Sequence, residues 1–338
     1  MKNIFRICSL AICILILNCQ STFAKTELIE ASGSYAIDLK MDETFASATA
    51  LAREEAKRAA TEKAGVYLQA YSKTVNLELE YDEVKTVAAQ LLKIQDEKVS
   101  SKSLDNGLLE ITVTIKALVE ENDDAILKTI MSDKQKLEEA TESYKKLQAE
   151  YDALKKQMDE YKRNYASANS SERKQIQKSV AQSNKYFEAL LALENGNKFY
   201  FNGNYQQAIS EYSRAINVKS NFAEAYNNRG NAYTKIQNYQ QAMQDLQTAA
   251  RLNNFDSRIH NNLGNVYLLQ NNYNSAISEY SQAINLNPNL FTAYFNRALA
   301  YCYLNQFQSA LPDAQRAMAL NPADADAKNL YDQIVRRV

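Results

Sequence analysis

The sequence predicts an α+β domain at the N-terminus, then a coiled-coil helix, then an all-α solenoid built from repeats. Apolar and polar residues alternate in several segments before residue 120, and an apolar residue returns at every seventh position after them. From residue 189 onward, a pattern recurs with a fixed long period, as from Gly196 to Gly230 and Gly264. Alternation indicates half-buried strands, a heptad indicates a coiled coil, and self-similarity at this period indicates stacked helical hairpins.

Residues 1–24 have the order of a secretory signal peptide. Lys2 and Arg6 precede an apolar run over residues 7–17, and a short segment ending at Ala24 follows. This order predicts cleavage after Ala24 and an exported protein that begins at Lys25. The expected location is therefore the periplasm, the cell envelope or the medium.

Cys19 supports an alternative, in which it is the lipidated residue of a bacterial lipoprotein and a membrane is a partner. The preceding Leu17 and Asn18 are bulkier than the small residues that such signals prefer. After cleavage at Ala24 the chain keeps one cysteine, Cys302, which cannot form an internal disulfide. Its helical context favours a small buried or groove-lining residue over a reactive one.

Residues 25–120 are expected to form the small α+β domain. Its expected elements, in chain order, are a strand over 27–39, helices over 44–71 and 82–92, and strands over 94–103 and 108–119. Alanine recurs at every fourth position of the first helix, which gives it a stripe that can lie close to a sheet. Asn106 and Gly107 predict a tight turn between the last two strands, because both residues tolerate positive φ angles.

These segments resemble a known family. The resemblance rests on the Ala-spaced helix, on Ala64-Gly65-Val66-Tyr67, on Tyr81-Asp82-Glu83-Val84 and on the strand at 111–119. Together they make residues 27–120 similar to the N-terminal domain of flagellar assembly protein T and related envelope lipoproteins. The resemblance implies an exported bacterial envelope protein with a small β-α-β module and no enzymatic activity of that module.

Residues 121–170 are predicted to form a coiled-coil helix that stands clear of both domains. The apolar positions that recur in each heptad are Ile130, Leu137, Tyr144, Tyr151, Met158 and Tyr165, with a second series at Ile126, Ala140, Leu147, Leu154 and Tyr161. This seam is compatible with self-association through 126–165 as a loose dimer, or with a long antiparallel packing. Residues 166–171 are rich in Ser and Asn and predict a hinge, followed by a connecting helix over 171–188.

The 34-residue stride is clearest from Gly196, which leads to Gly230, Gly264 and Ala298. The same stride links aromatic residues and alanines: Phe199, Tyr233, Tyr267 and Tyr301; Tyr205, Tyr239, Tyr273 and Phe307; Ala208, Ala242, Ala276 and Ala310. This pattern resembles four tetratricopeptide (TPR) repeats over 189–322, each a helical hairpin that is buried by its neighbours. Residues 323–338 are expected to form a capping helix with a polar outer face.

The composition and motifs argue against chemistry and against nucleic acid. The formal net charge is only −1, which does not suit a polyanionic partner. There is no zinc-binding Cys/His cluster, no Gly-rich phosphate loop and no Gly-x-Ser-x-Gly motif. His260, the single histidine, occupies the repeat position of Tyr226 and Tyr294, so we interpret it as a packing residue. We therefore expect no enzyme, no cofactor and no metal.

A ladder of amides is the candidate binding site. The residues concerned are Asn197, Asn231 and Asn265, directly after the small residue, and Asn228, Asn262 and Asn296, two positions before it. On the TPR resemblance they line the concave groove, where amides can bond an extended peptide backbone. The alternative is that they hydrogen-bond between adjacent hairpins. A clamp for a terminal carboxylate needs basic residues, and among the matching positions only Arg258 is charged.

The sequence therefore predicts an exported, non-enzymatic protein–protein interaction adaptor. Its partner is a protein or an extended peptide, bound in the concave groove of the repeats. The alternative is a structural assembly factor of a cell-envelope machine that docks through its N-terminal domain.

Overall fold

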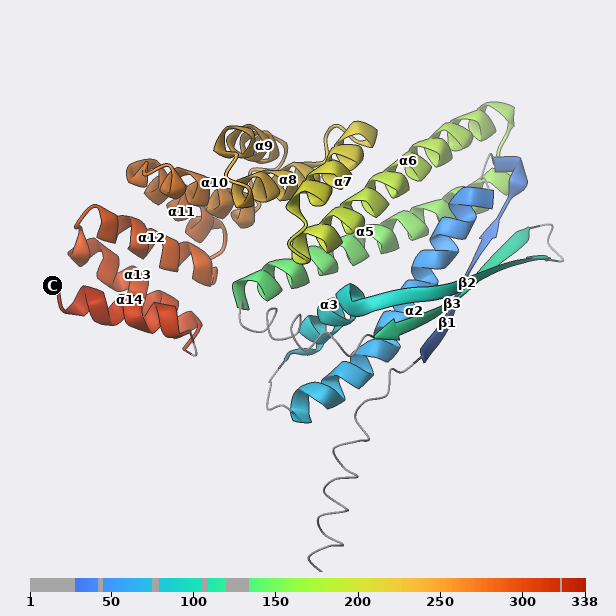
Figure 1. Cartoon of the computed structure of the whole chain (residues 1–338). Coiled ribbons are helices and arrows are strands. Elements are labelled where there is room, and N and C mark those ends of the chain that lie inside the picture. The colour runs from blue at the N-terminus through green and yellow to red at the C-terminus, as the bar shows by residue number, and fades with distance from the viewer. Residues whose placement is uncertain (1–27, 42–44, 75–78, 105–107, 120–133, 323) are drawn as a thin grey trace, which may run out of the picture. The chain divides into compact units, whose positions relative to one another are not determined.

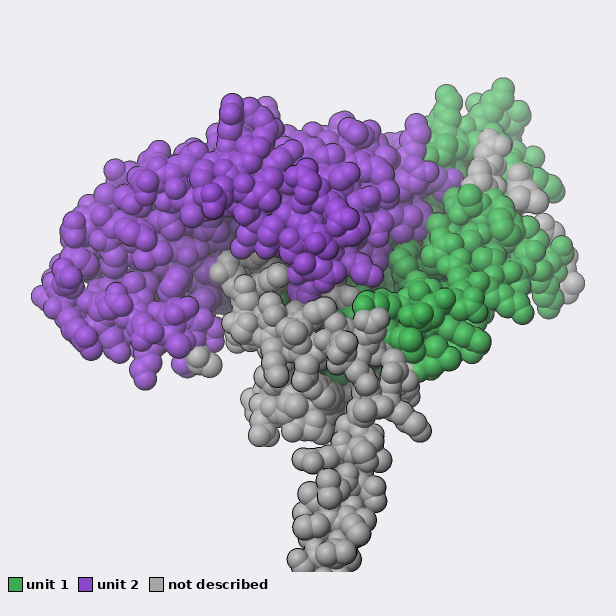
Figure 2. Space-filling model, viewed as in Figure 1, with its two compact units in different colours: residues 1–181 green, residues 182–338 purple. Residues whose placement is uncertain are grey.

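The structure is a computed structural model that describes residues 28–41, 45–74, 79–104, 108–119, 134–322 and 324–338 (Figure 1). The chain divides into two compact units, residues 1–181 and 182–338 (Figure 2). The expected signal peptide with Cys19, the turn at 105–107, and Ile126 and Ile130 of the heptad lie outside the described residues. Among the described residues, no helix combines the length and the apolar content that a membrane span requires.

The first unit contains a three-stranded antiparallel sheet. Its strands are β1 (Leu28–Ile37), β2 (Leu92–Ser103) and β3 (Leu109–Val119), in the spatial order β1-β3-β2. Ala31 lies opposite Ile115, and Val99 lies opposite Val113. Alternate residues of β1 and β3 are buried, as the sequence alternation predicts.

Helix α2 (Phe45–Thr74) packs on the inner face of this sheet (Figure 1). Its alanine stripe is completely buried: Ala48, Ala52, Ala56, Ala60 and Ala64. On β1, a Cβ atom on Gly33 would collide with the backbone of Ala52 and Ala56. Small residues on both elements therefore allow the helix backbone to approach the strand. A short 3-10 helix (Leu39–Met41) precedes α2, and α3 (Tyr81–Leu91) follows it.

Helix α5 (Lys134–Ser167) carries the predicted heptad, and it does not stand clear of the N-terminal domain. Arg58 of α2 forms an ion pair with Asp152 at 2.6 Å, and the Tyr165 hydroxyl donates to the carbonyl oxygen of Lys40 at 2.6 Å. The seam residues Leu147 and Leu154 are buried within this single chain. The expectation of a free-standing coiled coil is therefore wrong, because α2 and α3 offer this seam a partner inside the same chain.

The predicted hinge is a capped turn between α5 and α6 (Ser170–Phe201). The Asn169 side chain accepts hydrogen bonds from the backbone N–H groups of Ser171 and Glu172, at 3.0 and 3.1 Å. The Glu172 carboxylate accepts in return from the N–H of Asn169 at 2.8 Å. This reciprocal cap starts α6.

Met158 of α5 packs against Val180 of α6, so the two helices form an antiparallel hairpin here.

The second unit is a solenoid of consecutive helix pairs, as the 34-residue stride predicts. Its first pair consists of the C-terminal part of α6 and α7 (Tyr205–Val218). The following helices are α8 (Ala223–Lys235), α9 (Tyr239–Leu252), α10 (Ser257–Leu269), α11 (Tyr273–Leu286), α12 (Phe291–Tyr303), α13 (Phe307–Leu320) and the final α14 (Ala325–Val335). We call the first member of each pair its first helix and the other its second helix.

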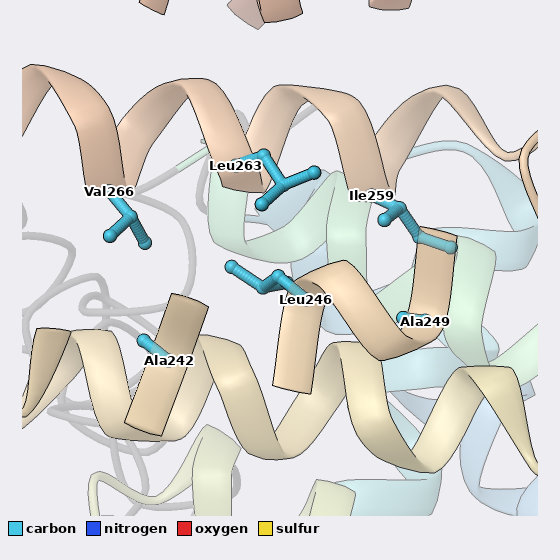
Figure 3. Packing of buried hydrophobic residues seen from close by; sticks show 6 residues of the cluster. All are labelled: Ala242, Leu246, Ala249, Ile259, Leu263 and Val266. Atoms are coloured by element: carbon cyan, nitrogen blue, oxygen red, sulfur yellow. The ribbon is translucent and has the colours of Figure 1, made fainter. Parts of the chain in front are cut away.

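Apolar residues bury each pair against the next. Figure 3 shows Ile259, Leu263 and Val266 of α10 facing Leu246 of the preceding α9. All four side chains are nearly completely buried. Because each hairpin needs its neighbour to cover this apolar surface, the array stabilises itself by stacking.

The turns inside the pairs share a left-handed backbone conformation. Gly203, Gln237, Asn271 and Asn305 have φ angles of 77°, 62°, 59° and 58°, and each occupies the same position of its own repeat. Gly and Asn adopt this region readily, whereas Gln does so at a conformational cost. Gln237 is therefore a strained position of the solenoid.

We predict that Gln237→Gly raises the free energy of unfolding by about 0.5–1 kcal/mol, because it relieves this strain. Gln244→Gly is the control, since Gln244 is exposed in the interior of α9 and glycine there costs about 1 kcal/mol. Denaturant unfolding measures both variants. Equal destabilisation by the two changes would contradict the explanation.

Candidate functional site

The first helices of successive pairs form one continuous surface. Helix α8 contacts α10, and α10 contacts α12, while second helices contact one another more weakly. Closer spacing on one side curves a solenoid toward that side. We call the surface formed by residues 182–201, α8, α10 and α12 the first-helix face, and it carries all of the site residues predicted from the sequence.

The predicted amides bond one another between neighbouring first helices. Asn228 Nδ2 donates to Asn197 Oδ1 at 2.9 Å, and Asn296 Nδ2 donates to Asn265 Oδ1 at 3.0 Å. Both pairs join successive repeats. These contacts are those of the alternative interpretation, in which the ladder holds adjacent hairpins together.

Two buried tyrosines complete these contacts. The hydroxyl of Tyr212 donates to Asn197 Oδ1, and the hydroxyl of Tyr280 donates to Asn265 Oδ1, both at 2.9 Å. Each of these amide oxygens thus accepts two hydrogen bonds, which uses the usual acceptor capacity of a carbonyl oxygen. Burial raises the pKa of both tyrosines, so the hydroxyls stay protonated donors.

The middle of the ladder has a different arrangement. Asn262 Nδ2 donates to Asn227 Oδ1, and Asn227 Nδ2 donates to Asn228 Oδ1, both at 3.0 Å. Asn227 and Asn262 are only 3% and 5% exposed, so neither can reach a partner protein without rearrangement. Asn231 is half-buried, and its side chain makes no hydrogen bond with the described residues. Asn227 was not among the site residues predicted from the sequence.

Arg258 is not a free cation of the groove. Its guanidinium forms a two-pronged contact with Glu224, at 3.2 and 2.8 Å, and it also bonds Asp256 at 2.7 Å. Burial lowers the pKa of Arg258, but the two carboxylates outweigh it and keep the pKa above its ordinary value. Arg258 therefore joins α8 to α10, and its assignment to partner binding stays a prediction. Glu224 occupies in the preceding repeat the position that Arg258 occupies in its own. The sequence shows this relation, because the two residues are one repeat apart.

His260 has a polar role that the packing interpretation omitted. It is 8% exposed, its Nδ1 lies 2.8 Å from a carboxylate oxygen of Glu279, and its Nε2 lies 3.4 Å from the carbonyl oxygen of Asn254. Both facing atoms are acceptors, so both ring nitrogens are best satisfied as N–H donors. The hydrogen bond to Glu279 raises the pKa of His260 above its ordinary value, although burial opposes it.

A second set of contacts reveals a double repeat. Arg229 bonds Asp245 within its own pair and Ser213 of the preceding pair, at distances from 2.7 to 2.9 Å. The same contacts recur two repeats later, between Arg297, Asp313 and Ser281. The first and third interfaces therefore share one chemistry, whereas the second uses Arg258 and the Asn262–Asn227 bond. The single-repeat period of 34 residues does not reveal this relation, which appears in the sequence at twice that spacing.

Exposed apolar side chains lie at the C-terminal ends of the first helices. Leu269 and Tyr303 are 50% and 55% exposed. They occupy the same position of successive repeats, and Lys235 occupies it in the second pair. The Tyr303 ring stacks on Tyr273 with centroids 4.9 Å apart, so the aromatic surface is held in place. These side chains can receive apolar groups of another molecule.

The comparisons with known proteins agree with this architecture. A TPR repeat model matches residues 196–237, 230–271 and 264–302, and a tetratricopeptide repeat model matches residues 291–324. A comparison with curated proteins finds no match. Residues 196–324 are thus TPR repeats. The matched residues do not include the N-terminal domain, so its resemblance to flagellar assembly protein T stays a prediction.

Solved structures that are similar to part of this chain include an Arabidopsis OM64 TPR domain and two crystal structures of MamA. The OM64 domain is 22% identical with a TM-score of 0.34, covering 34% of this chain and 96% of that one. The MamA structures are 20% and 22% identical, with TM-scores of 0.38 and 0.37. They cover 44% and 42% of this chain, and 87% and 89% of their own.

TPR repeats define a class of protein–protein interaction adaptors, whose members are typically scaffolds without enzymatic activity. Among the described residues, no group of His, Cys, Asp and Glu side chains is arranged to hold a metal ion. Cys302 is partly buried, and burial raises the pKa of its thiol, which does not favour a reactive thiolate.

We predict that changing Asn228, Asn262 and Asn296 together to Ala lowers the free energy of unfolding by about 1.5–4.5 kcal/mol, because each change removes one bond of about 0.5–1.5 kcal/mol between repeats. The control changes three exposed helical residues, Asn217, Asn274 and Asn285, to Ala. Thermal melting compares the two triple variants. Equal melting temperatures would show that the amides do not hold the repeats together.

The His260–Glu279 contact predicts a pH dependence of stability. In the folded protein the pKa of His260 is raised above its unfolded value of about 6.5. The contact therefore contributes its full stabilisation of the folded state below about pH 6.5, and this contribution is lost as the pH rises through the folded pKa. Glu279→Gln should reduce this loss, measured by denaturant unfolding from about pH 5.5 to pH 8.5.

Glu211→Gln is the matched control, because Glu211 occupies the position of Glu279 in the first pair and bonds Arg214 instead of a histidine. It should leave the pH dependence unchanged. An unaltered pH profile in Glu279→Gln would contradict the role of this contact.

Proposed function

We propose that the protein is an exported adaptor that captures a segment of another protein on the first-helix face. The observation that carries this proposal is the pair of exposed apolar residues, Leu269 and Tyr303, at matching ends of successive first helices. A regular spacing of apolar groups on a preformed surface suits the anchor side chains of a bound segment.

The hydrogen-bond network supports this use of the surface. Asn228 and Asn296 hold neighbouring first helices together, and Arg258 does the same in the middle of the array. A surface fixed before binding loses less conformational entropy when it receives a partner. In this proposal the amides therefore maintain the geometry of the surface, and apolar side chains make the contact. This differs from the amide grip that the sequence suggested.

Export is the second part of the proposal. It rests on the order of charged, apolar and small residues over residues 1–24. An adaptor outside the cytoplasm would meet envelope or secreted proteins.

We predict that Leu269→Asp combined with Tyr303→Asp reduces crosslinked capture of envelope proteins by about tenfold or more, since charged groups replace two apolar anchors. The control is Phe255→Asp, which alters a side chain 79% exposed in the loop before α10. Quantitative mass spectrometry of crosslinked pull-downs compares these variants with the unaltered protein. Undiminished capture by the double variant would contradict binding on this face.

For export, we predict that the protein recovered from outside the cytoplasm begins at Lys25. N-terminal sequencing and intact mass measure this directly. A chain that begins at an acylated Cys19 would establish the lipoprotein alternative, and a cytoplasmic protein that still begins at Met1 would contradict export.

A further inference from the structure

Strand β2 is an edge strand, since the sheet order is β1-β3-β2. Only Leu92 of β2 is buried and only Glu97 is half-buried, while its other residues are exposed. Helix α2 covers mainly β1 and β3. An edge strand presents backbone N–H and C=O groups that can pair with a further strand.

The apolar residues of β2 lie partly uncovered. Val99 is 39% exposed and lies opposite the fully buried Val113 of β3. It therefore belongs to the inner face of the sheet, at the margin that α2 leaves open. A strand added beside β2 would bring a side chain next to Val99 and cover it.

Charge limits which strand can pair there. On the outer face, Asp96, Lys98 and Lys102 are exposed, and none of them forms an ion pair with the described residues. The register shift between Ile94 and Asp96 restricts the regular part of β2 to residues 96–103. Lysines and such bulges protect edge strands against unselected pairing, so a true partner must match these charges.

We propose that β2 pairs with β2 of a second copy of this chain, antiparallel and with the two-fold axis at Val99. Residues opposite each other then have numbers that add up to 198. Asp96 of each copy lies opposite Lys102 of the other copy, and Lys98 of each copy lies opposite Ser100 of the other. The two copies of Val99 face each other at the axis. Asp96 and Lys102 each gain a partner of opposite sign, and Val99 becomes covered.

Neighbouring registers are less favourable. With the axis at residue 97, the two copies of Glu97 lie opposite each other, and with the axis at residue 98, the two copies of Lys98 do. Both registers place like charges together. With the axis at residue 100, Lys98 of each copy lies opposite Lys102 of the other copy, which places like charges together. With the axis at residue 101, Asp96 of each copy extends past the end of the partner strand and has no residue opposite it. A shift by half a step would place inner-face residues opposite outer-face residues, which the alternation of side chains along strands forbids. The charges of β2 thus favour the register centred on Val99.

The dimer joins two β3-β2 hairpins into one continuous sheet. It does not use the heptad seam, which α5 buries within its own chain. Each dimer would carry two TPR arrays, so it could hold two sites of one partner at the same time and gain avidity. The pairing itself does not depend on what the arrays bind.

A cysteine crosslink tests the register in the mature full-length protein with Cys302→Ala. Directly opposed residues have Cα atoms about 4.5–5.5 Å apart, within the range that a disulfide bridges. Val99→Cys should therefore form a covalent dimer on mild oxidation. Ser101→Cys is the control, because its two copies lie about 14 Å apart along the strand direction. Crosslinking of both positions alike, or of residue 101 alone, would overturn the register.

A charge exchange tests the pairing independently, by sedimentation over a range of concentrations. Asp96→Lys and Lys102→Asp should each weaken the dimer by about tenfold or more, because like charges then lie opposite each other twice. The double variant should recover most of the affinity, and Lys98→Gln should change little. A protein that stays monomeric, or a double variant as weak as the single variants, would overturn the proposal.

Discussion

The close approach of the two helices in each repeat is the constraint on which the solenoid depends. A Cβ atom on Gly264 would lie 2.5 Å from the Tyr280 ring, and one on Gly230 would lie 2.7 Å from the Leu246 side chain. In the fourth repeat both positions are alanine, since Ala298 faces Ala314 within one apolar cluster. In the second and third repeats, a large side chain on one helix is thus matched by a glycine on the other, which keeps the interior filled.

This packing fixes the spacing of the first helices, and the polar network follows from that spacing. The hydroxyl of Tyr280, whose ring fills the space beside Gly264, reaches Asn265. Asn265 in turn accepts from Asn296 of the next repeat. Packing inside a repeat and hydrogen bonding between repeats are therefore coupled through one side chain. The same set occurs two repeats earlier, around Tyr212, so the array is a tandem of two double repeats.

The sequence predicted the fold well where a repeating pattern of apolar or small residues lies within one segment of the chain. Strands β1 and β3 follow from alternation, α2 from its alanine stripe and the helix pairs from the 34-residue stride. Contacts between different elements were harder to predict. The sequence shows which residues share one face of a helix, but it does not show which other element packs against that face. Leu147 and Leu154 were correctly placed on a seam, but the seam packs within the chain. Asn228 was correctly placed on the first-helix face, but its amide turns toward the neighbouring repeat. The partner of Arg258 was detectable, because Glu224 lies one stride earlier.

The central claim is that partners bind the first helices and that the second helices support them. Site-specific photocrosslinking in cells tests it most directly. A photoreactive residue is placed at exposed positions of first helices, Lys235 or Leu269, or of second helices, Gln247 or Gln282. The account predicts adducts with another protein at the first two positions and none at the other two. Adducts confined to Gln247 and Gln282 would contradict it.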